Sequence, residues 1–404
     1  MSFQSKSSKV VKNFLVASLV MGAISGTAAA QSASPALFAP VTALKAELNT
    51  VQNARLTQVS RLPTTASVQM VRIDLNALTG KSARIGFGDG QIAEFGKQKV
   101  DTRSNNSYTW YGNLPGLQGS AILVVNNDAI TGTIHHGSEL YHVEPLADGL
   151  HALVKVNQAA FPPDHPPSFK NIKPGPMPKI LNSAIVGPPV PVDVLVAYTT
   201  SAKNAVGDIQ AKIQLAIDEA NQSYVNSDIL VFLLKADTIE IPYSETGKSY
   251  ETILADFVAN STVANRRTTS GADLSVMLIN QPQACGLANA IMANANNAYA
   301  LVHYNCATGY YSFAHEIGHL QGARHDPVAD SSTTPFSYGH GYQYGNSWRT
   351  IMAYDCKVSC PRLPYWSNPY INYNGVAMGN SSTSNNARVL NETASTVFNF
   401  RRRP

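Results

Sequence analysis

Three histidines lie close together in the segment HEIGHLQGARHD, which spans residues 315–326. His315 and His319 are four residues apart, so on a helix both imidazoles would lie on one face and could reach a single ion. Gly322 permits the backbone to leave the helix, and we expect that turn to bring His325 to the same ion. Three neutral imidazoles leave a coordination position open for water, which is typical of catalytic zinc sites.

Glu316 directly follows the first of these histidines. Zinc lowers the pKa of bound water to about 7, and a neighbouring carboxylate can accept its proton. We therefore predict that Glu316 is the general base of a zinc-dependent hydrolase. The alternative is a chance His-Glu-x-x-His pattern on a structural helix, against which the fixed positions of Gly322, His325 and Asp326 argue.

The zinc motif is followed by TIMAY at residues 350–354, and together they resemble the metzincin metallopeptidases. The resemblance implies that Met352 forms a hydrophobic floor beneath the zinc ligands without being a ligand. The position of Asp326, directly after the third histidine, resembles the pattern of the reprolysin branch of this clan. Residues 190–402 resemble bacterial secreted peptidyl-Asp metalloendopeptidases through VDVLVAYT (192–199), CGLANA (285–290) and YWSNP (365–369).

Tyr354 departs from the reprolysin pattern, because it stands two residues after Met352. This Met-x-Tyr arrangement is similar to that of astacins and serralysins, where the tyrosine can bind zinc and then stabilise the oxyanion. The resemblance implies a catalytic or ligand role for Tyr354, and a packed tyrosine with a satisfied hydroxyl is the alternative.

The resemblance to peptidyl-Asp enzymes also implies cleavage on the amino side of aspartate. Such a preference needs a cationic pocket, in which an arginine could pair bidentately with the carboxylate. In metzincins the chain after the Met-turn forms this wall, so the candidates are Lys357 and Arg362, with Arg349 behind them. Each of them alone could equally be an ordinary surface cation.

Strands and helices alternate in residues 192–404, which predicts an α/β domain with a mixed, mostly parallel sheet of the metzincin type. The apolar runs at residues 192–198, 229–235 and 274–279 are typical of buried strands. Apolar residues at helical spacing predict long helices at residues 202–224, 250–258 and 385–400.

Residues 31–160 contain short β-prone runs separated by Gly, Asn and Asp, and we interpret them as a β-rich propeptide. Residues 161–191 are rich in proline and predict an exposed, extended linker that contains or lies near the processing site. No cysteine precedes residue 285, so a propeptide cysteine cannot block the zinc. Asp164 or His165 could occupy the open zinc position instead, or this stretch could simply be solvated.

The chain begins with a basic segment, an apolar core and small residues, which predicts a signal peptide over residues 1–30 and export. An exported chain with four cysteines favours disulfides. Of the three possible pairings we prefer Cys285–Cys306 with Cys356–Cys360, because each pair closes a local loop.

The formal net charge of +4 does not indicate a nucleic-acid partner. Residues 191–404 carry 14 Lys and Arg against 16 Asp and Glu, so the basic excess belongs to the first half and forms no patch interleaved with aromatics. We expect no membrane association after signal removal. Calcium at Asp326 and Asp330 has no EF-hand spacing to support it.

These patterns predict a secreted zinc endopeptidase made as a zymogen, with polypeptide substrates and its own propeptide as inhibitor. One alternative is a secreted protease of the same chemistry and broad specificity. Another is an exported binding protein in which zinc is structural, against which the intact Glu316 argues.

Overall fold

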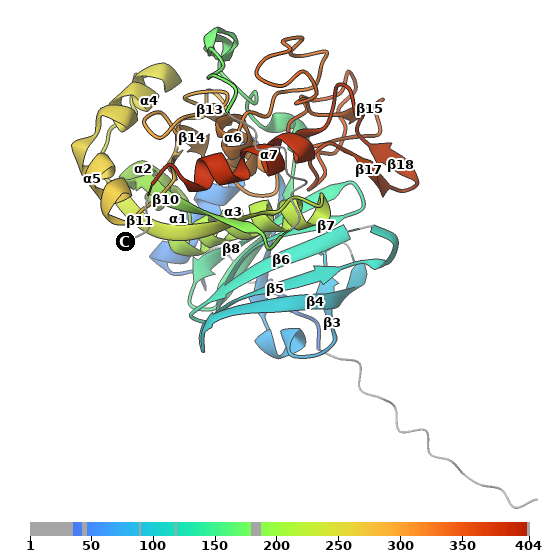
Figure 1. Ribbon diagram of the computed structural model, residues 1–404. Helices are drawn as coiled ribbons and strands as arrows, with labels where there is room; N and C mark the ends of the chain where they lie inside the picture. The colour runs from blue at the N-terminus through green and yellow to red at the C-terminus, as the bar shows by residue number, and fades with distance from the viewer. Residues whose placement is uncertain (1–34, 43–46, 89, 118, 179–186, 402–404) are drawn as a thin grey trace, which may run out of the picture. The chain divides into compact units, whose positions relative to one another are not determined.

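The computed structural model describes residues 35–42, 47–88, 90–117, 119–178 and 187–401 (Figure 1). The predicted signal peptide, residues 1–30, lies outside these residues. No helix within the described ranges is long and apolar enough to cross a membrane.

The first half forms one antiparallel sheet of nine strands in the order β1-β2-β9-β8-β7-β6-β5-β4-β3. Short turns connect neighbouring strands, and Asn127 and Asp128 between β6 and β7 both have the positive φ that a two-residue hairpin turn requires. A helix that the sequence analysis did not predict, α1 (Thr50–Ser60), precedes β2. The strands are β1 (Phe38–Pro40), β2 (Thr65–Ile73), β3 (Ser82–Gly86), β4 (Ile92–Ser104), β5 (Ser107–Asn113), β6 (Gly119–Asn126), β7 (Ala129–His136), β8 (Glu139–Ala147) and β9 (Leu150–Val156).

The second half is built on a five-stranded sheet in the order β11-β10-β12-β14-β13. All neighbours are parallel except β13, which is the edge strand and runs antiparallel to β14. The observed sheet is therefore mixed and mostly parallel, as predicted. Its strands are β10 (Val190–Thr199), β11 (Val231–Ile241), β12 (Leu274–Ile279), β13 (Gly286–Ala288) and β14 (Tyr299–His303). The remaining strands form two small hairpins, β15 (Gln343–Tyr344) with β16 (Trp348–Arg349) and β17 (Asn368–Tyr373) with β18 (Val376–Met378).

The helix predicted over residues 202–224 is interrupted, so this prediction is wrong in detail. Asp208 ends the irregular stretch, because its side chain accepts hydrogen bonds from the N–H groups of Gln210 and Ala211 and so starts a new helix. Gly207 lies against the first half, where a Cβ would be 2.5 Å from the Pro145 carbonyl oxygen. The helices of the second half are α2 (Thr200–Ala205), α3 (Ile209–Asn226), α4 (Tyr250–Ala259), α5 (Ser261–Thr269), α6 (Ser312–Leu320) and α7 (Asn386–Phe398).

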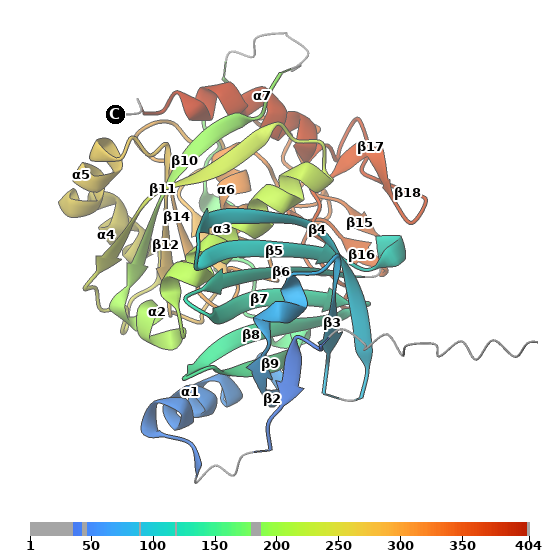
Figure 2. The ribbon, with the colours of Figure 1, turned by 90° about the horizontal axis from the view of Figure 1, so that it is seen from below.

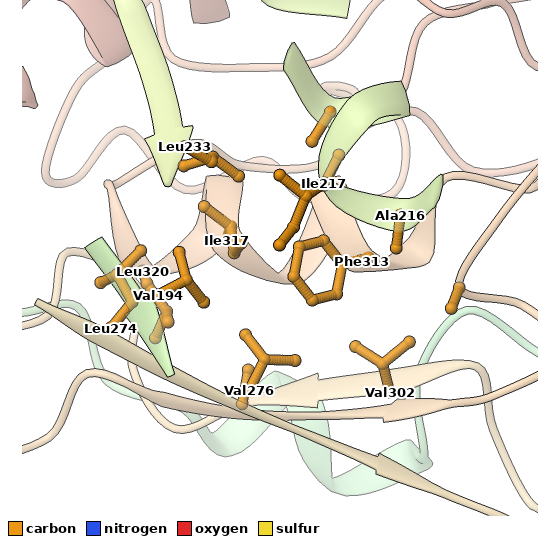
Figure 3. Close-up of a cluster of buried hydrophobic side chains, with 14 of the residues drawn as sticks. Val194, Ala216, Ile217, Leu233, Leu274, Val276, Val302, Phe313, Ile317 and Leu320 are labelled. Carbon is orange, nitrogen blue, oxygen red and sulfur yellow. The ribbon is translucent and has the colours of Figure 1, made fainter. Parts of the chain in front are cut away.

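Helices α3 and α6 share the main hydrophobic core with the five-stranded sheet (Figure 3). Phe313, Ile317 and Leu320 follow helical spacing and form the apolar face of α6. They pack among Ile217 of α3 and strand residues such as Val276, all of them buried. This packing fixes α6, and with it the side chains on the rest of that helix.

Helix α3 also lies against the first-half sheet (Figure 2). Tyr111 of β5 and Ile122 and Val124 of β6 pack on Ala211 and Leu215 of the helix. Polar contacts accompany this core: the Thr109 hydroxyl donates to Asp218 (2.6 Å), Asn126 donates to Asp208 (2.6 Å), and Lys212 pairs with Glu144 at 2.8 Å. The two halves therefore share a buried interface that combines apolar packing with specific polar pairs.

The start of the proline-rich stretch is not exposed, which corrects the prediction for that part. Phe161, His165 and Phe169 are buried. The N–H groups of Cys285 and Gly286, at the edge of the sheet, donate to the carbonyl oxygens of Pro163 (2.8 Å) and Asp164 (3.0 Å). Prolines lack a backbone donor but keep an acceptor, so this stretch can pair with an edge strand despite its composition.

Acidification is expected to destabilise the intact chain. Burial lowers the pKa of His142 to about 3 and that of His151 to about 4. Because the unfolded value is about 6.5, the unfolded chain binds more protons as the pH falls through this window. Glu219 acts in the opposite sense, since burial raises its pKa to about 7 and protonation stabilises its folded form. His135 and His303 act in the same sense as His142 and His151, because burial lowers the pKa of each to about 4. These four histidines therefore oppose one glutamate, and the folded chain should lose stability steeply between about pH 6.5 and 4.5.

Thermal unfolding of the intact chain between about pH 7 and 5 would check this expectation. The Tm of His142→Gln should fall less steeply than that of the wild type, because this variant lacks one of the histidines whose pKa is lowered by burial. Comparing the two proteins cancels any contribution of bound metal, which both share. Parallel curves would contradict the assignment.

Candidate metal centre

Helix α6 carries His315, Glu316 and His319, all of them buried. The helix ends at Leu320, and Gly322 has a φ of 102°, a conformation that L-residues with a side chain rarely adopt. The backbone turns there and returns His325 to the two helical histidines, as the sequence predicts.

The three imidazoles face one another through their Nε2 atoms. Nε2 of His319 lies 3.1 Å from that of His315 and 3.0 Å from that of His325, and the third separation is 3.3 Å. Nδ1 of His315 is 2.8 Å from the Ile351 carbonyl oxygen, and Nδ1 of His319 is 2.9 Å from that of Ala323. A carbonyl only accepts, so these Nδ1 atoms carry the protons and the Nε2 lone pairs point at each other.

This donor set fits a tetrahedral metal ion. A tetrahedron with zinc–nitrogen bonds of about 2.0–2.1 Å has nitrogen–nitrogen edges of about 3.3 Å, close to the observed separations. The converging lone pairs of His315 and His319 repel one another unless a cation lies between them, and the carbonyl partners at Nδ1 orient these two rings as metal ligands require. Burial lowers the pKa of all three histidines well below the usual range, which keeps them neutral.

The Glu316 carboxylate lies beside this cluster, with Oε1 3.1 Å from Nε2 of His165. Burial, reinforced by the nearby Asp164, raises the pKa of Glu316 well above its usual value. His165 belongs to the same group of potential metal ligands as the three motif histidines, with the ligand atoms of all four within 4.8 Å of one another. A residue from the first half of the chain thus enters the site.

Met352 and Tyr354 lie on the segment that follows the small hairpin β15–β16. Met352 is fully buried beneath α6, where a Cβ on Gly318 would be 2.9 Å from its Sδ atom. The N–H of Tyr354 donates to Asp326 (2.9 Å), and its hydroxyl is 3.1 Å from Nδ1 of His165. The segment therefore forms the floor of the cluster and brings a phenol to its rim.

Two buried arginines hold the Asp164 carboxylate, and with Tyr310 they form what we call the two-arginine pocket. Nη2 of Arg362 lies 2.8 and 2.7 Å from the two carboxylate oxygens, and Nη1 of Arg349 lies 3.6 Å from one of them. The guanidinium of Arg362 stacks on the Tyr310 ring at 4.2 Å. Burial alone would raise the pKa of Asp164, but the two arginines outweigh it and the pKa is lowered.

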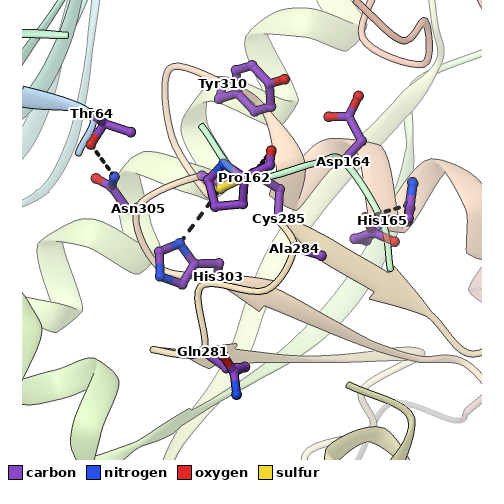
Figure 4. Close-up of a disulfide and its surroundings, with 12 residues drawn as sticks. Thr64, Pro162, Asp164, His165, Gln281, Ala284, Cys285, His303, Asn305 and Tyr310 are labelled. Atoms are coloured by element: carbon purple, nitrogen blue, oxygen red, sulfur yellow. Dashed lines mark hydrogen bonds and ion pairs between the residues drawn. A yellow bond between two sulfur atoms is a disulfide. The ribbon is translucent and has the colours of Figure 1, made fainter. Parts of the chain in front are cut away.

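Lys357 is not part of this pocket, because it is exposed on the loop closed by Cys356–Cys360. The other disulfide, Cys285–Cys306, ties the sheet edge to the loop before α6 and lies beside Asp164 and His165 (Figure 4). Both disulfides have the pairing expected from local loop closure.

The two carboxylates considered for calcium have protein partners, Arg324 for Asp330 and backbone N–H groups for Asp326.

Sequence reasoning missed one residue of this site and left two others as an open alternative. Tyr310 carries no motif, and only its place before α6 could have drawn attention to it. His165 and Asp164 were considered, but their proline-rich setting indicated solvent. The useful signal was the pair itself, the sole acid and the sole histidine of residues 161–191.

Comparison with known proteins agrees with this geometry. Residues 190–367 match the Metallo-peptidase family M12. A peptidyl-Asp metalloendopeptidase of Xanthomonas campestris pv. campestris is 42% identical over 95% of this chain and 97% of that protein. A peptidyl-Asp metalloendopeptidase of Stenotrophomonas maltophilia (strain K279a) is 41% identical over 95% of this chain and 97% of that protein. A shorter one of Pseudomonas fragi is 43% identical over 45% of this chain and all of that protein. The chain therefore belongs to the Metallo-peptidase family M12, together with these bacterial metalloendopeptidases.

Proposed function

We propose that this metalloendopeptidase uses zinc, is exported as a zymogen, and cleaves peptide bonds on the amino side of aspartate. The N-terminal 30 residues support export through their signal-peptide pattern. The names of the relatives and the two-arginine pocket support the aspartate preference. The first-half sheet would be the propeptide, and residues 161–191 would contain or adjoin the processing site.

The observation that carries the specificity is the Asp164 carboxylate between Arg362 and Arg349. An aspartate of a bound substrate would take its place once residues 161–178 have left. Buried guanidinium groups without an anion are costly, so the pocket would reject asparagine, which has the same shape and no charge. This reasoning makes Arg362 and Arg349 the specificity residues and leaves Lys357 the weaker candidate.

The catalytic roles follow from the same geometry. His315, His319 and His325 would hold the zinc ion, which supplies Lewis acidity and lowers the pKa of water at the site. Glu316 would take a proton from the attacking water and deliver it to the leaving amine. Tyr354 would donate its hydroxyl hydrogen to the developing oxyanion, and Met352 would support the ligands from below.

Hydrolysis of two quenched peptides that differ only in Asp or Asn tests this proposal. Processed protein should cleave before Asp, lose activity with a chelator and regain it with added zinc, while the Asn peptide stays uncut. Equal cleavage of both peptides would replace the aspartate preference with broad specificity. No cleavage by correctly processed, zinc-loaded protein would favour a non-enzymatic zinc-stabilised binding protein.

Gly286→Ala is expected to reduce kcat about 100-fold, the effect of displacing a catalytic group by about 1 Å. A Cβ at Gly286 would overlap the Glu316 carboxylate, and this flexible end would move more readily than the backbone. Kinetics of the processed variant check the prediction, with zinc content and Tm showing that the site and fold persist. Full activity would mean that Glu316 does not need its observed position.

A further inference from the structure

We propose that His165 is the fourth ligand of the metal ion in the uncleaved chain, and that Asp164 beside it fastens this ligand in place. The inference rests on the proposed function in one respect, namely that the three motif histidines bind the metal. It adds a mechanism of latency that uses an imidazole from the first half of the chain.

The four imidazole rings are arranged as the corners of a tetrahedron. The ring centroids of His315, His319 and His325 are 4.7–5.3 Å apart. The centroid of His165 lies 5.0, 5.1 and 4.7 Å from these three in turn. The distances from the His165 ring to the three ligand rings thus match the distances among the ligand rings themselves. His165 lies at the fourth corner, which a catalytic site leaves open for water.

The same ring contacts the two groups that hydrolysis would need. Its Nε2 is 3.1 Å from Glu316 and its Nδ1 is 3.1 Å from the Tyr354 hydroxyl. Phe169 covers it, with ring centroids 4.0 Å apart, and the imidazole is buried. The ligand atoms of His165 and the motif histidines lie within 4.8 Å of one another, so rotation of the His165 ring toward them would exchange one of these contacts for a bond to the metal. Either arrangement keeps water away from Glu316.

Asp164 explains why a single imidazole can hold this position. Its carboxylate is bound by Arg362 and Arg349, and its carbonyl oxygen accepts the Gly286 N–H. Prolines stand on both sides, at positions 162, 163, 166 and 167. They restrict the backbone before it binds and so reduce the entropy lost on binding. Asp164 occupies the specificity pocket while His165 occupies the metal, so one dipeptide closes both parts of the site.

The cobalt-substituted intact chain provides a test that does not depend on activity. Azide binds at an open coordination position and changes the visible spectrum of cobalt. The intact wild type should show no azide-dependent change. His165→Ala should differ from it in the spectrum before azide and should respond to azide. His136→Ala is the matched control, because His136 lies in the same half, stacked on Phe87, and this variant should behave like the wild type.

Identical spectra of the wild type and His165→Ala, with equal azide responses, would overturn the proposal. If His165→Ala does not fold, His165→Gln keeps a polar side chain and replaces it in the same comparison. Cobalt content and hydrolysis by processed wild-type protein are measured in parallel. If the chain binds no cobalt and the processed wild type does not hydrolyse peptides, the proposed function is refuted. If cobalt binds and hydrolysis occurs but the two spectra are identical, only the role of His165 is refuted.

Discussion

Glu316→Gln is expected to reduce hydrolysis by the processed enzyme about 10²–10⁴-fold, the range typical of a lost general acid–base group. Glutamine has nearly the same shape but cannot accept the proton of the attacking water. The three motif histidines do not depend on this carboxylate, since carbonyl oxygens at Nδ1 orient two of them. The bound zinc should therefore be retained.

Steady-state kinetics and metal analysis of the purified variant would check this expectation. Glu240→Gln is a suitable control, because Glu240 pairs with Lys203 at a partly exposed position and the variant should keep full activity. Loss of zinc from Glu316→Gln would assign the residue a structural role. Unchanged hydrolysis with zinc bound would exclude it as the base.

Arg362→Gln is expected to remove most of the preference for aspartate. Removing one partner of a buried ion pair costs about 3–5 kcal/mol, or a factor of about 10²–10⁴ in kcat/KM for the Asp peptide. Arg349 remains, but it is the more distant partner at 3.6 Å. Cleavage of the Asn peptide should change little, because that side chain gains nothing from the lost charge.

The same variant makes a second, independent prediction for the intact chain. Asp164 would lose the Arg362 nitrogen that contacts both of its carboxylate oxygens while it stays buried, so the intact protein should unfold at a lower temperature than the wild type. Arg388→Gln serves as the control, since Arg388 forms an exposed helical pair with Glu392. An unchanged Asp-to-Asn ratio for Arg362→Gln would move the specificity site elsewhere.

The parts of the site that lie within one local motif were predictable from sequence. His315, Glu316 and His319 share one helix, and Gly322 makes the turn that returns His325, so the spacing alone determines their geometry. Three of the four parallel strands, β10, β11 and β12, and most helices followed from hydrophobic periodicity, whereas the parallel strand β14 was not predicted. The break before Asp208 was missed because the apolar pattern continues across it, although Val206 is already extended and Asp208 caps a new helix.

The contacts between distant residues could not be predicted in this way. Asp164 and Arg362 are 198 positions apart, and no periodicity relates them. Composition pointed in the wrong direction at residues 161–169, because proline usually indicates solvent but here supplies backbone acceptors to the edge strand. Candidates for the cationic pocket could be named, but only the folded chain distinguishes Arg362 from Lys357.

The interface between α3 and the first-half sheet has a consequence for activation. While the chain is intact, the Asp164–His165 pair is presented at an effective concentration of about millimolar. A single cut in the linker would not lower this, because the packing of β5 and β6 on α3 and the buried Lys212–Glu144 pair would keep the pieces together. Asp164 is the sole Asp or Glu of residues 161–191, so an aspartate-directed enzyme would depend on another protease for any cut after that residue. We therefore expect onset of activity to follow loss or degradation of the sheet, so that it lags behind linker cleavage and speeds up on dilution.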